Sequence, residues 1–203
     1  MIRPQSENFW YSESEFEIMK RTLESAKILG ADGFVFGILN KIPEDGKQHA
    51  LSWVDVSRNK QLVQLAGGKP CTFHRAFDCI PESCWDAAFS QITECGFAAI
   101  LTNGGPSSDK AIDCVDKLAT LASKQDHLFR QLARTGIPVP DIIVGGGVRS
   151  TNIQALLKGT NAHVFHSSAL KTSSEVVEKK EVEKLRESLM MLRRSPEGQY
   201  SIG

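Results

Sequence analysis

The sequence predicts an α/β fold in which helices cover a parallel sheet. Short segments that are apolar throughout, such as residues 34–36 and 141–144, alternate with longer amphipathic segments of helical period. Strands without polar alternation are typical of parallel sheets that are buried on both faces. Glycines recur after the amphipathic segments, where a helix end favours a residue with positive φ. Repeated βα units of this size favour a (β/α) barrel, with a doubly wound sheet as the alternative.

The first predicted helix begins at a capping box of Ser14 and Glu17. Phe16 and Leu23 lie at helical spacing within it, and Gly30 is expected to end it. Further helices are expected over residues 54–66, 84–94, 110–135, 152–157 and 175–194. The polar stretch within 110–135 predicts two helices or an insertion there. The glycines expected to end helices are Gly30, Gly67, Gly96, Gly136 and Gly159.

Strands are expected near residues 2–4, 34–36, 70–74, 98–101, 141–144 and 163–165. These are six strands, whereas a closed barrel has eight, and the first begins directly at Met1. About two βα units, roughly 50 to 60 residues, would complete a barrel of ordinary size. We therefore expect a single incomplete barrel domain over residues 1–203. The corresponding hypothesis is an N-terminally truncated product or an incomplete gene model.

The composition excludes several classes of function. Lysine plus arginine number 24, as do aspartate plus glutamate, so no excess charge favours nucleic acid or an acidic membrane surface. No apolar run approaches a membrane span, and the first residues lack the apolar core of a signal peptide. We therefore expect a cytoplasmic protein. Its five cysteines show no C-x-x-C spacing and are expected to be reduced thiols.

The most informative segment is residues 72–78, with the sequence TFHRAFD. It lies where a buried strand is predicted to pass into a loop, which is the binding edge of a parallel sheet. Because side chains alternate along a strand, Thr72 and His74 share one face, and Cys71 and Phe73 share the other. We therefore expect His74 at the site and Cys71 in the packing against helices.

Arg75 and Asp78 are expected at the mouth of the sheet, where the planar guanidinium of an arginine can bind an anion. Their spacing leaves two interpretations open. One is a catalytic or binding site with His74, Arg75 and Asp78 as candidates, in which His74 or Asp78 would be the acid or base. The other is an ion pair between Arg75 and Asp78 that only braces the loop.

Two glycine-rich turns follow later strands. Gly145, Gly146 and Gly147 come directly after strand 141–144, where backbone N–H groups can approach an anion without hindrance from a Cβ atom. Asn103 and Gly104 repeat this arrangement after the preceding strand. The alternative for both segments is a tight turn without a ligand.

The histidines give weak support for a metal site. His166 ends the last predicted strand, so it could face the same mouth as His74. The weak metal-ligand candidates are His74, His166 and Cys79, and no spacing such as H-E-x-x-H specifies a metal. Ser167 or Ser168 beside His166 lacks the elbow motif of a serine nucleophile.

Taken together, the motifs resemble the CutC copper homeostasis family. They are IRP at 2–4, GADGFVFG at 30–37, TFHRAFD at 72–78, LTNGG at 101–105, GGGV at 145–148 and HSSA at 166–169. The resemblance covers nearly all of residues 1–170 and leaves 171–203 as a C-terminal helix and tail. It implies a TIM (β/α)8 barrel in the cytosol with a role in copper handling and with Cu(I) as a ligand. The anion-binding candidates at its mouth are Arg3, Arg75, Asn103, Gly104, Gly145, Gly146, Gly147 and Ser168.

The chain also departs from the family pattern. The family begins with two βα units that this chain lacks, and those units carry interior Glu and Cys residues. Thiolates are the ligands that Cu(I) prefers, so the best metal ligands of the family are missing here. The segments 40–52 and 123–140 are longer than usual, and Asn103 stands where Ser is common.

Three functions remain open from the sequence. The first is a CutC-type copper homeostasis protein that binds Cu(I). The second is a barrel enzyme acting on a small phosphorylated or carboxylated metabolite, and the third is a non-functional or regulatory fragment. The expected partner is a copper ion or a small anionic molecule. The sequence decides neither whether the chain is an enzyme nor whether a homo-oligomer closes the barrel.

Overall fold

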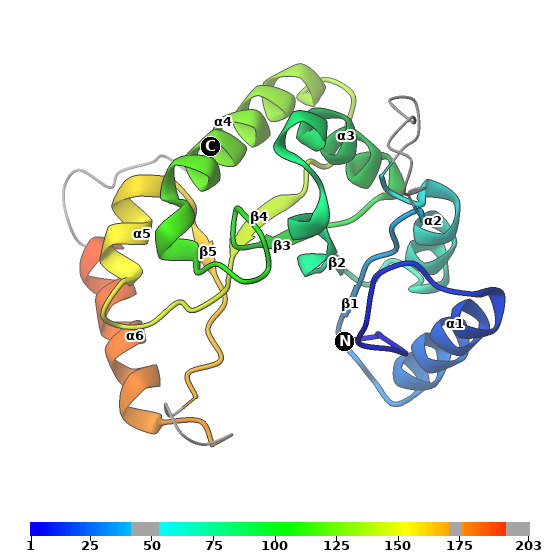
Figure 1. Ribbon diagram of the computed structural model, residues 1–203, viewed down its shortest axis with the longest axis horizontal. Helices are drawn as coiled ribbons and strands as arrows, with labels where there is room; N and C mark the ends of the chain where they lie inside the picture. The colour runs from blue at the N-terminus through cyan, green and yellow to red at the C-terminus, as the bar shows by residue number, and fades with distance from the viewer. Residues whose placement is uncertain (42–52, 171–175, 194–203) are drawn as a thin grey trace.

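The computed structural model describes residues 1–41, 53–170 and 176–193, and it forms an arch around a parallel sheet (Figure 1). The strands of this described part are β1 (Phe34–Phe36), β2 (Cys71–Phe73), β3 (Ala99–Thr102), β4 (Asp141–Val144) and β5 (Val164–Phe165). Every neighbouring pair is parallel, and the order in the sheet is β1-β2-β3-β4-β5. An order that follows the chain without reversal is that of a (β/α) barrel, because a doubly wound sheet reverses at a switch point.

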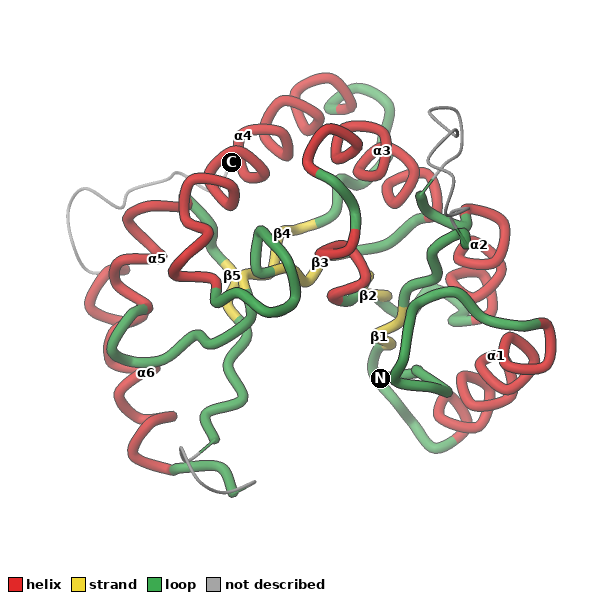
Figure 2. Tube along the Cα trace, viewed as in Figure 1, coloured by secondary structure: helices red, strands yellow, loops and turns green. Residues whose placement is uncertain are grey.

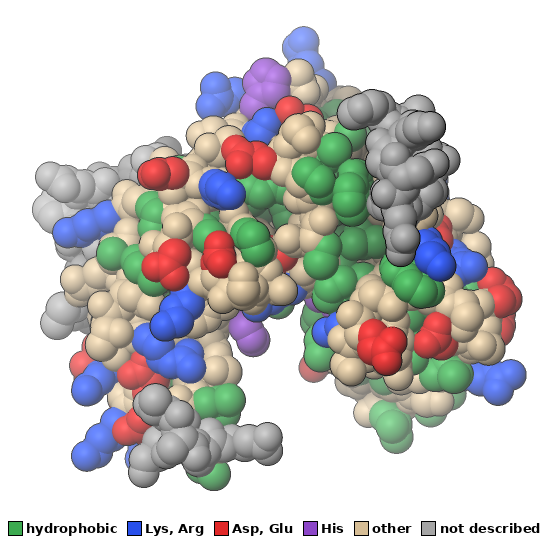
Figure 3. Space-filling view, viewed as in Figure 1, with side chains coloured by type: hydrophobic (Ala, Val, Ile, Leu, Met, Phe, Trp, Pro, Cys, Tyr) green, Lys and Arg blue, Asp and Glu red, His purple; other side chains and the backbone are tan. Residues whose placement is uncertain are grey.

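The helices line the outer side of the arch, and the strands lie inside it (Figure 2). The α-helices are α1 (Glu13–Ile28), α2 (Val56–Leu65), α3 (Trp85–Cys95), α4 (Val115–Leu132), α5 (Ile153–Thr160) and α6 (Lys179–Arg193). Short 3₁₀ turns are η1 (Arg75–Cys79), η2 (Glu82–Cys84) and η3 (Ala111–Cys114). In the space-filling view the arch is open between the parts that hold α1 and α6 (Figure 3). No helix of the described residues is long and apolar enough to cross a membrane.

The core lies between the sheet and the helices. Phe36, Phe73 and Ile100 are fully buried, and the rings of Phe36 and Phe73 both pack on Phe97, with ring centroids 5.1 and 5.3 Å away. Side chains of the opposite strand face, Val35, Thr72, Leu101 and Ile143, are only half-buried. The alternation expected for β2 is therefore confirmed, with Cys71 and Phe73 on the helix side and Thr72 on the inner side.

Two predictions near the N-terminus are wrong. Residues 2–4 are not a strand, although the N–H of Ile2 donates to the carbonyl oxygen of Val35 at 2.8 Å. Pro4 has no N–H with which to extend this pairing. The capping box of α1 is formed by Ser12 and Glu15 rather than by Ser14 and Glu17. Both pairs fit the motif, but the earlier one places buried Tyr11 and Phe16 at the flanking positions of a hydrophobic staple.

The expected glycine helix ends are confirmed at Gly30, Gly67 and Gly96, which have positive φ. Gly136 also has positive φ, but it lies in the turn beyond Ala133, the C-cap of α4. Gly159 differs, because it lies inside α5 and the left-handed residue after that helix is Asn161, with φ of 54°. A Cβ atom on Gly159 would collide with the side chain of Val115, at the start of α4. Gly159 is therefore needed for close packing between α4 and α5.

The segment 110–135 forms η3 followed by one continuous helix, α4, so the alternative of two α-helices is wrong. Its polar stretch does not break the helix because those side chains project outward, as with exposed Ser123 and His127. Most of the long loop predicted at 40–52 lies outside the described residues, as do 171–175 and 194–203 of the C-terminal segment.

Replacing Gly159 with alanine is expected to destabilise the fold, although alanine is the better helix former. The propensity gain is about 0.5–1 kcal/mol, whereas overpacking costs about 1–3 kcal/mol. Urea unfolding of Gly159→Ala should therefore show a lower free energy of unfolding. The double variant Val115→Ala/Gly159→Ala should regain part of the loss relative to Val115→Ala alone. A stabilised single variant would contradict the packing role.

Candidate functional site

The candidate site lies at the carboxyl ends of the strands, where the loops after β2, β3, β4 and β5 meet. Backbone hydrogen bonds continue the sheet into this edge: the N–H of His74 donates to Phe36, that of Gly145 to Thr102, and that of His166 to Val144, at 2.8–3.0 Å. Because the strands are parallel, their following loops are held at one edge, which is where barrel proteins bind ligands.

Asp78 is the centre of this edge, and its side chain is completely buried. Its Oδ2 accepts from Nε of Arg75 at 2.6 Å. Its Oδ1 accepts from the Thr102 hydroxyl at 2.5 Å and from the N–H of Asn103 at 3.2 Å. Burial raises the pKa of the Asp78 carboxyl, and the hydrogen bonds from Thr102 and Arg75 oppose this effect. The carboxylate thus ties the loop after β2 to the end of β3.

Arg75 is one-third exposed and holds its ion pair with Asp78 through one side of the guanidinium only. Nη2 makes a long hydrogen bond of 3.4 Å to the carbonyl oxygen of Ser107. The Cζ and Nη2 atoms also lie 3.7 Å from the point that a Cβ of Gly146 would occupy. Arg75 therefore both braces the loop and reaches the glycine turn after β4, so its two sequence interpretations are not exclusive.

The glycine turn, Gly145 to Gly147, has a backbone conformation and close contacts that residues other than glycine would not fit. Gly146 and Gly147 have φ of +93° and +79°, and a Cβ on Gly146 would lie 2.9 Å from Cβ of Asn103. Within the described residues, the N–H groups of Gly146 and Gly147 form no hydrogen bond. Two N–H donors next to a guanidinium are an arrangement that can bind an anion. The N–H of Gly145, by contrast, is used by Thr102.

Asn103 and Gly104 are occupied by their own turn. The Asn103 side chain is fully buried, donates to the carbonyl oxygens of Pro106 and Asp109, and accepts from the N–H of Gly105. The N–H of Gly104 donates to the hydroxyl of Thr102. These two residues shape the loop after β3, and their hydrogen bonds within that loop leave the expected anion contacts to other residues.

His74 lies beneath the mouth instead of lining it, with 3% of its surface exposed. Nδ1 accepts from the N–H of Ala76, and the ring meets Phe9 with centroids 4.9 Å apart. Nε2 has no hydrogen-bond partner among the described residues. Burial, aided by the positive charge of Arg3, lowers the pKa of His74 to about 4. The ring is therefore neutral at pH 7 and poorly placed for the acid or base role expected of it.

Ser168 and His166 lie in the exposed loop after β5, and Ser168 meets a residue to which the sequence assigned no role. Arg149, just after the glycine turn, donates to the hydroxyls of Ser167 and Ser168 at 3.3 and 3.4 Å. The position of Arg149 in the sequence, two residues after three glycines at a strand end, could have indicated that it belongs to this edge. Arg149 adds a second cation to this edge.

Arg3 and Cys79 line a shared cavity with Arg75. The Arg3 guanidinium lies 4.4 Å from the centre of the Phe9 ring and donates to the carbonyl oxygens of Gln5 and Ser6. The Cys79 side chain is exposed, while Cys71 and Cys95 are buried, and burial raises their thiol pKa values to about 11 and about 12. Burial also raises the pKa of Cys79. The packing role predicted for Cys71 agrees with its position.

Within the described residues, the three metal-ligand candidates are not gathered into one cluster. Across the residues that the structure describes, no three His, Cys, Asp or Glu side chains gather in a way that could hold an ion. His74 is buried while His166 and Cys79 are exposed, so the three candidates occupy different environments.

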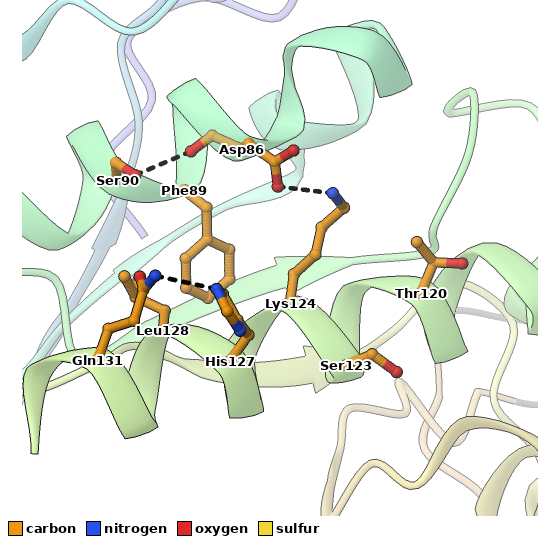
Figure 4. Close-up of a pocket in the computed structure, with 9 residues that line it drawn as sticks. All are labelled: Asp86, Phe89, Ser90, Thr120, Ser123, Lys124, His127, Leu128 and Gln131. Atoms are coloured by element: carbon orange, nitrogen blue, oxygen red, sulfur yellow. Dashed lines mark hydrogen bonds and ion pairs between the residues drawn. The ribbon is translucent and has the colours of Figure 1, made fainter.

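A second hollow of about 490 Å³ lies between α3 and α4 on the outer, helical side (Figure 4). Phe89 and Leu128 form its apolar part. Its polar groups are paired with each other: Lys124 with Asp86 at 2.6 Å, and Gln131 with His127 at 2.9 Å. These pairs leave few groups for a ligand, so the strand edge is the better candidate site.

Consecutive parallel strands with outer helices and charged loops at their carboxyl ends define a protein of the (β/α)-barrel class. The model of the CutC family matches residues 1–171, and the chain belongs to that family. The copper homeostasis protein cutC homologs of Mus musculus and Homo sapiens are each 36% identical, over 169 and 172 residues. The alignments cover 83% and 85% of this chain, which spans only 53% and 54% of the relatives. The crystal structure of CutC from Streptococcus agalactiae superimposes with a TM-score of 0.67 at 29% identity, covering 81% of this chain and 69% of that one.

Replacing Asp78 with alanine is expected to lower the free energy of unfolding by about 3–5 kcal/mol, because Arg75 loses its buried partner and Thr102 its acceptor. Urea unfolding at pH 7 measures this. Asp113→Ala, at an exposed site of η3, is the control and should change stability by about 0.5 kcal/mol or less. Equal effects of the two substitutions would show that the Asp78 network is not a stability determinant.

Acid is expected to destabilise the fold through His74. The unfolded chain takes up a proton near the ordinary pKa of 6.5, but the folded chain does so only near pH 4. Stability is therefore lost as the pH falls between these values, by up to about 3 kcal/mol at 1.36 kcal/mol per pKa unit. His74→Gln should lose less stability than the wild type between pH 7 and pH 4, as measured by urea unfolding. The exposed-site variant His127→Gln should follow the wild type, and an unchanged pH profile in His74→Gln would refute the assignment.

Proposed function

We propose that this chain takes part in copper homeostasis, the role that the names of its mouse and human relatives give to those proteins. The family match over residues 1–171 is the observation that supports the proposal. Because the chain spans about half the length of these relatives, its ligand is part of the proposal as well. The ion expected is Cu(I), which the protein would bind and pass on as its cargo. Thiolates are the ligands that Cu(I) prefers.

The described residues do not form a complete Cu(I) site by themselves. The thiol that favours contact with copper is Cys79, because it is exposed and lines the cavity beside Arg75. Cys71, Cys95 and Cys114 are buried, and Cys84 is half-buried. Since burial raises the pKa of Cys79, a bound Cu(I) must displace its proton, and binding should strengthen as the pH rises.

Cys79→Ala is expected to reduce the Cu(I) taken up by this chain in competition with a chromophoric chelator under anaerobic conditions. The physical reason is the loss of the accessible thiolate. Cys84→Ala is the matched control and should retain the wild-type titration, because that side chain does not line the cavity. Unchanged uptake in Cys79→Ala would remove this thiol as a copper ligand.

A second candidate function is the binding of a small phosphorylated or carboxylated molecule at the strand edge. The observation that favours it is the position of Arg75 against Gly146, next to two unbonded N–H groups. Arg149 and the Ser168 hydroxyl add donors on the β5 side. Of the three residues expected to perform catalysis, Asp78 and His74 are buried and only Arg75 is open to a ligand. The geometry thus supports binding more strongly than catalysis.

Arg149→Gln is expected to weaken inorganic phosphate binding about tenfold, because a charge-assisted hydrogen bond contributes about 1.5 kcal/mol or more. Isothermal titration calorimetry at low ionic strength measures this. Arg134→Gln, in the exposed turn after α4, is the matched control and should bind as the wild type does. Phosphate binding that is weak in the wild type and equal in all three proteins would contradict the anion site.

A further inference from the structure

A cavity of about 570 Å³ opens beside Arg75. The loops after β1, β2 and β3 contribute to its wall, together with the segment that precedes α1. Its volume falls within the range of small-molecule sites in proteins, about 300–1,000 Å³. The copper proposal uses one thiol of its wall, Cys79, and leaves the aromatic and cationic side chains of the cavity without a role.

Aromatic side chains form one part of this wall. Trp10 is 41% exposed, and Trp53 and Phe9 are half-buried. The third tryptophan, Trp85, is buried elsewhere and donates to the carbonyl oxygen of Ile80. Lys41 Nζ lies over the Trp10 ring, 4.7 Å from its centre. Indole rings that keep exposed surface in a concave site are suited to stacking against the flat face of a ligand ring.

Cations form the other part. Arg3 donates to the carbonyl oxygens of Gln5 and Ser6, and within the described chain it forms no ion pair. Arg75 forms an ion pair with Asp78 through Nε. Among the described residues that line the cavity, Glu7 is the one carboxylate. This described lining, with two guanidinium groups and one carboxylate, favours an anionic ligand over a cationic one.

Arg75 connects this cavity to the glycine turn. It lines the cavity, and its guanidinium lies 3.7 Å from the point where a Cβ of Gly146 would be. An anion held by Arg75 and the N–H groups of Gly146 and Gly147 would therefore lie at the border of the aromatic cavity. A ligand that reaches from the glycine turn into the aromatic cavity must be a small molecule that carries both an anionic group and a ring.

We propose that the mouth binds a small metabolite in which a flat aromatic or heteroaromatic ring is joined to a phosphate group. The phosphate lies at Arg75 and the Gly146–Gly147 turn, and the ring lies against Trp10 and Trp53. This inference rests on the anion-binding function proposed above and specifies its substrate class. The three terminal oxygens of a phosphate suit several converging donors, which a single carboxylate would leave partly unused.

The test uses two ring phosphates, AMP and pyridoxine 5′-phosphate, as probes. Adenosine and pyridoxine, which carry the ring without the phosphate, and inorganic phosphate, which lacks the ring, are the comparison ligands. Calorimetry measures affinity, and quenching of tryptophan fluorescence reports the ring, because Trp85 is buried and the exposed signal comes from Trp10 and Trp53. At least one ring phosphate should bind at least tenfold more tightly than inorganic phosphate and than the same ring compound without its phosphate. Its binding should also quench the tryptophan fluorescence.

Two variants separate the contributions. Trp53→Leu should remove the advantage of the ring phosphate while leaving inorganic phosphate binding unchanged. Phe129→Leu is the matched control, an exposed aromatic residue on α4 outside the cavity, and should change neither. Thermal melts followed by circular dichroism confirm that both variants are folded.

The outcomes distinguish this inference from the proposal on which it rests. If inorganic phosphate binds but no ring phosphate binds more tightly, the ring site is refuted and the anion site stands. If neither phosphate nor ring phosphate binds, both are refuted. Equal loss of ring-phosphate affinity in Trp53→Leu and Phe129→Leu would also overturn the assignment of the ring to the cavity.

Discussion

The buried carboxylate of Asp78 is the constraint on which the strand edge depends. It accepts hydrogen bonds from Arg75, Thr102 and the backbone of Asn103, and no part of its side chain reaches solvent. A buried charge without partners costs several kcal/mol, so the loops after β2 and β3 cannot separate without losing these bonds together. The same network holds the Arg75 guanidinium in one orientation.

That orientation gives Arg75 two roles. Its Nε side is committed to Asp78, while its far side lies against the turn at Gly146. A preorganised guanidinium loses little side-chain entropy when it binds an anion, which is the condition for a useful binding contact. The glycine turn complements it, because Gly146 and Gly147 have positive φ angles and no Cβ of Gly146 fills the space beside the guanidinium. The ion pair of Arg75 with Asp78 thus both stabilises the loop after β2 and positions the guanidinium to bind an anion.

Copper and anion binding make different demands on this edge. Cu(I) needs soft ligands, and the described part of the chain offers one exposed thiol, Cys79, without two further metal ligands beside it. An anion needs converging donors, and Arg75, Arg149 and the glycine turn supply them. Both ligands would meet near Arg75, because Cys79 lines the same cavity. Family membership supports the first function and local geometry supports the second.

The sequence by itself determined the parallel α/β class, five of the strands, and the helix ends at Gly30, Gly67 and Gly96. These features depend on local periodicity and on backbone conformations that only glycine adopts easily. It also located the loops that form the strand edge. Only the tertiary structure decided that His74 is covered by Phe9, that Asn103 is used by its own turn, and that Gly159 packs on Val115. It alone brought Arg149 to Ser168 and Trp53 to the cavity of Arg3. Burial and contact between distant segments depend on how the loops meet after the strands have paired, and no spacing within one segment encodes that meeting.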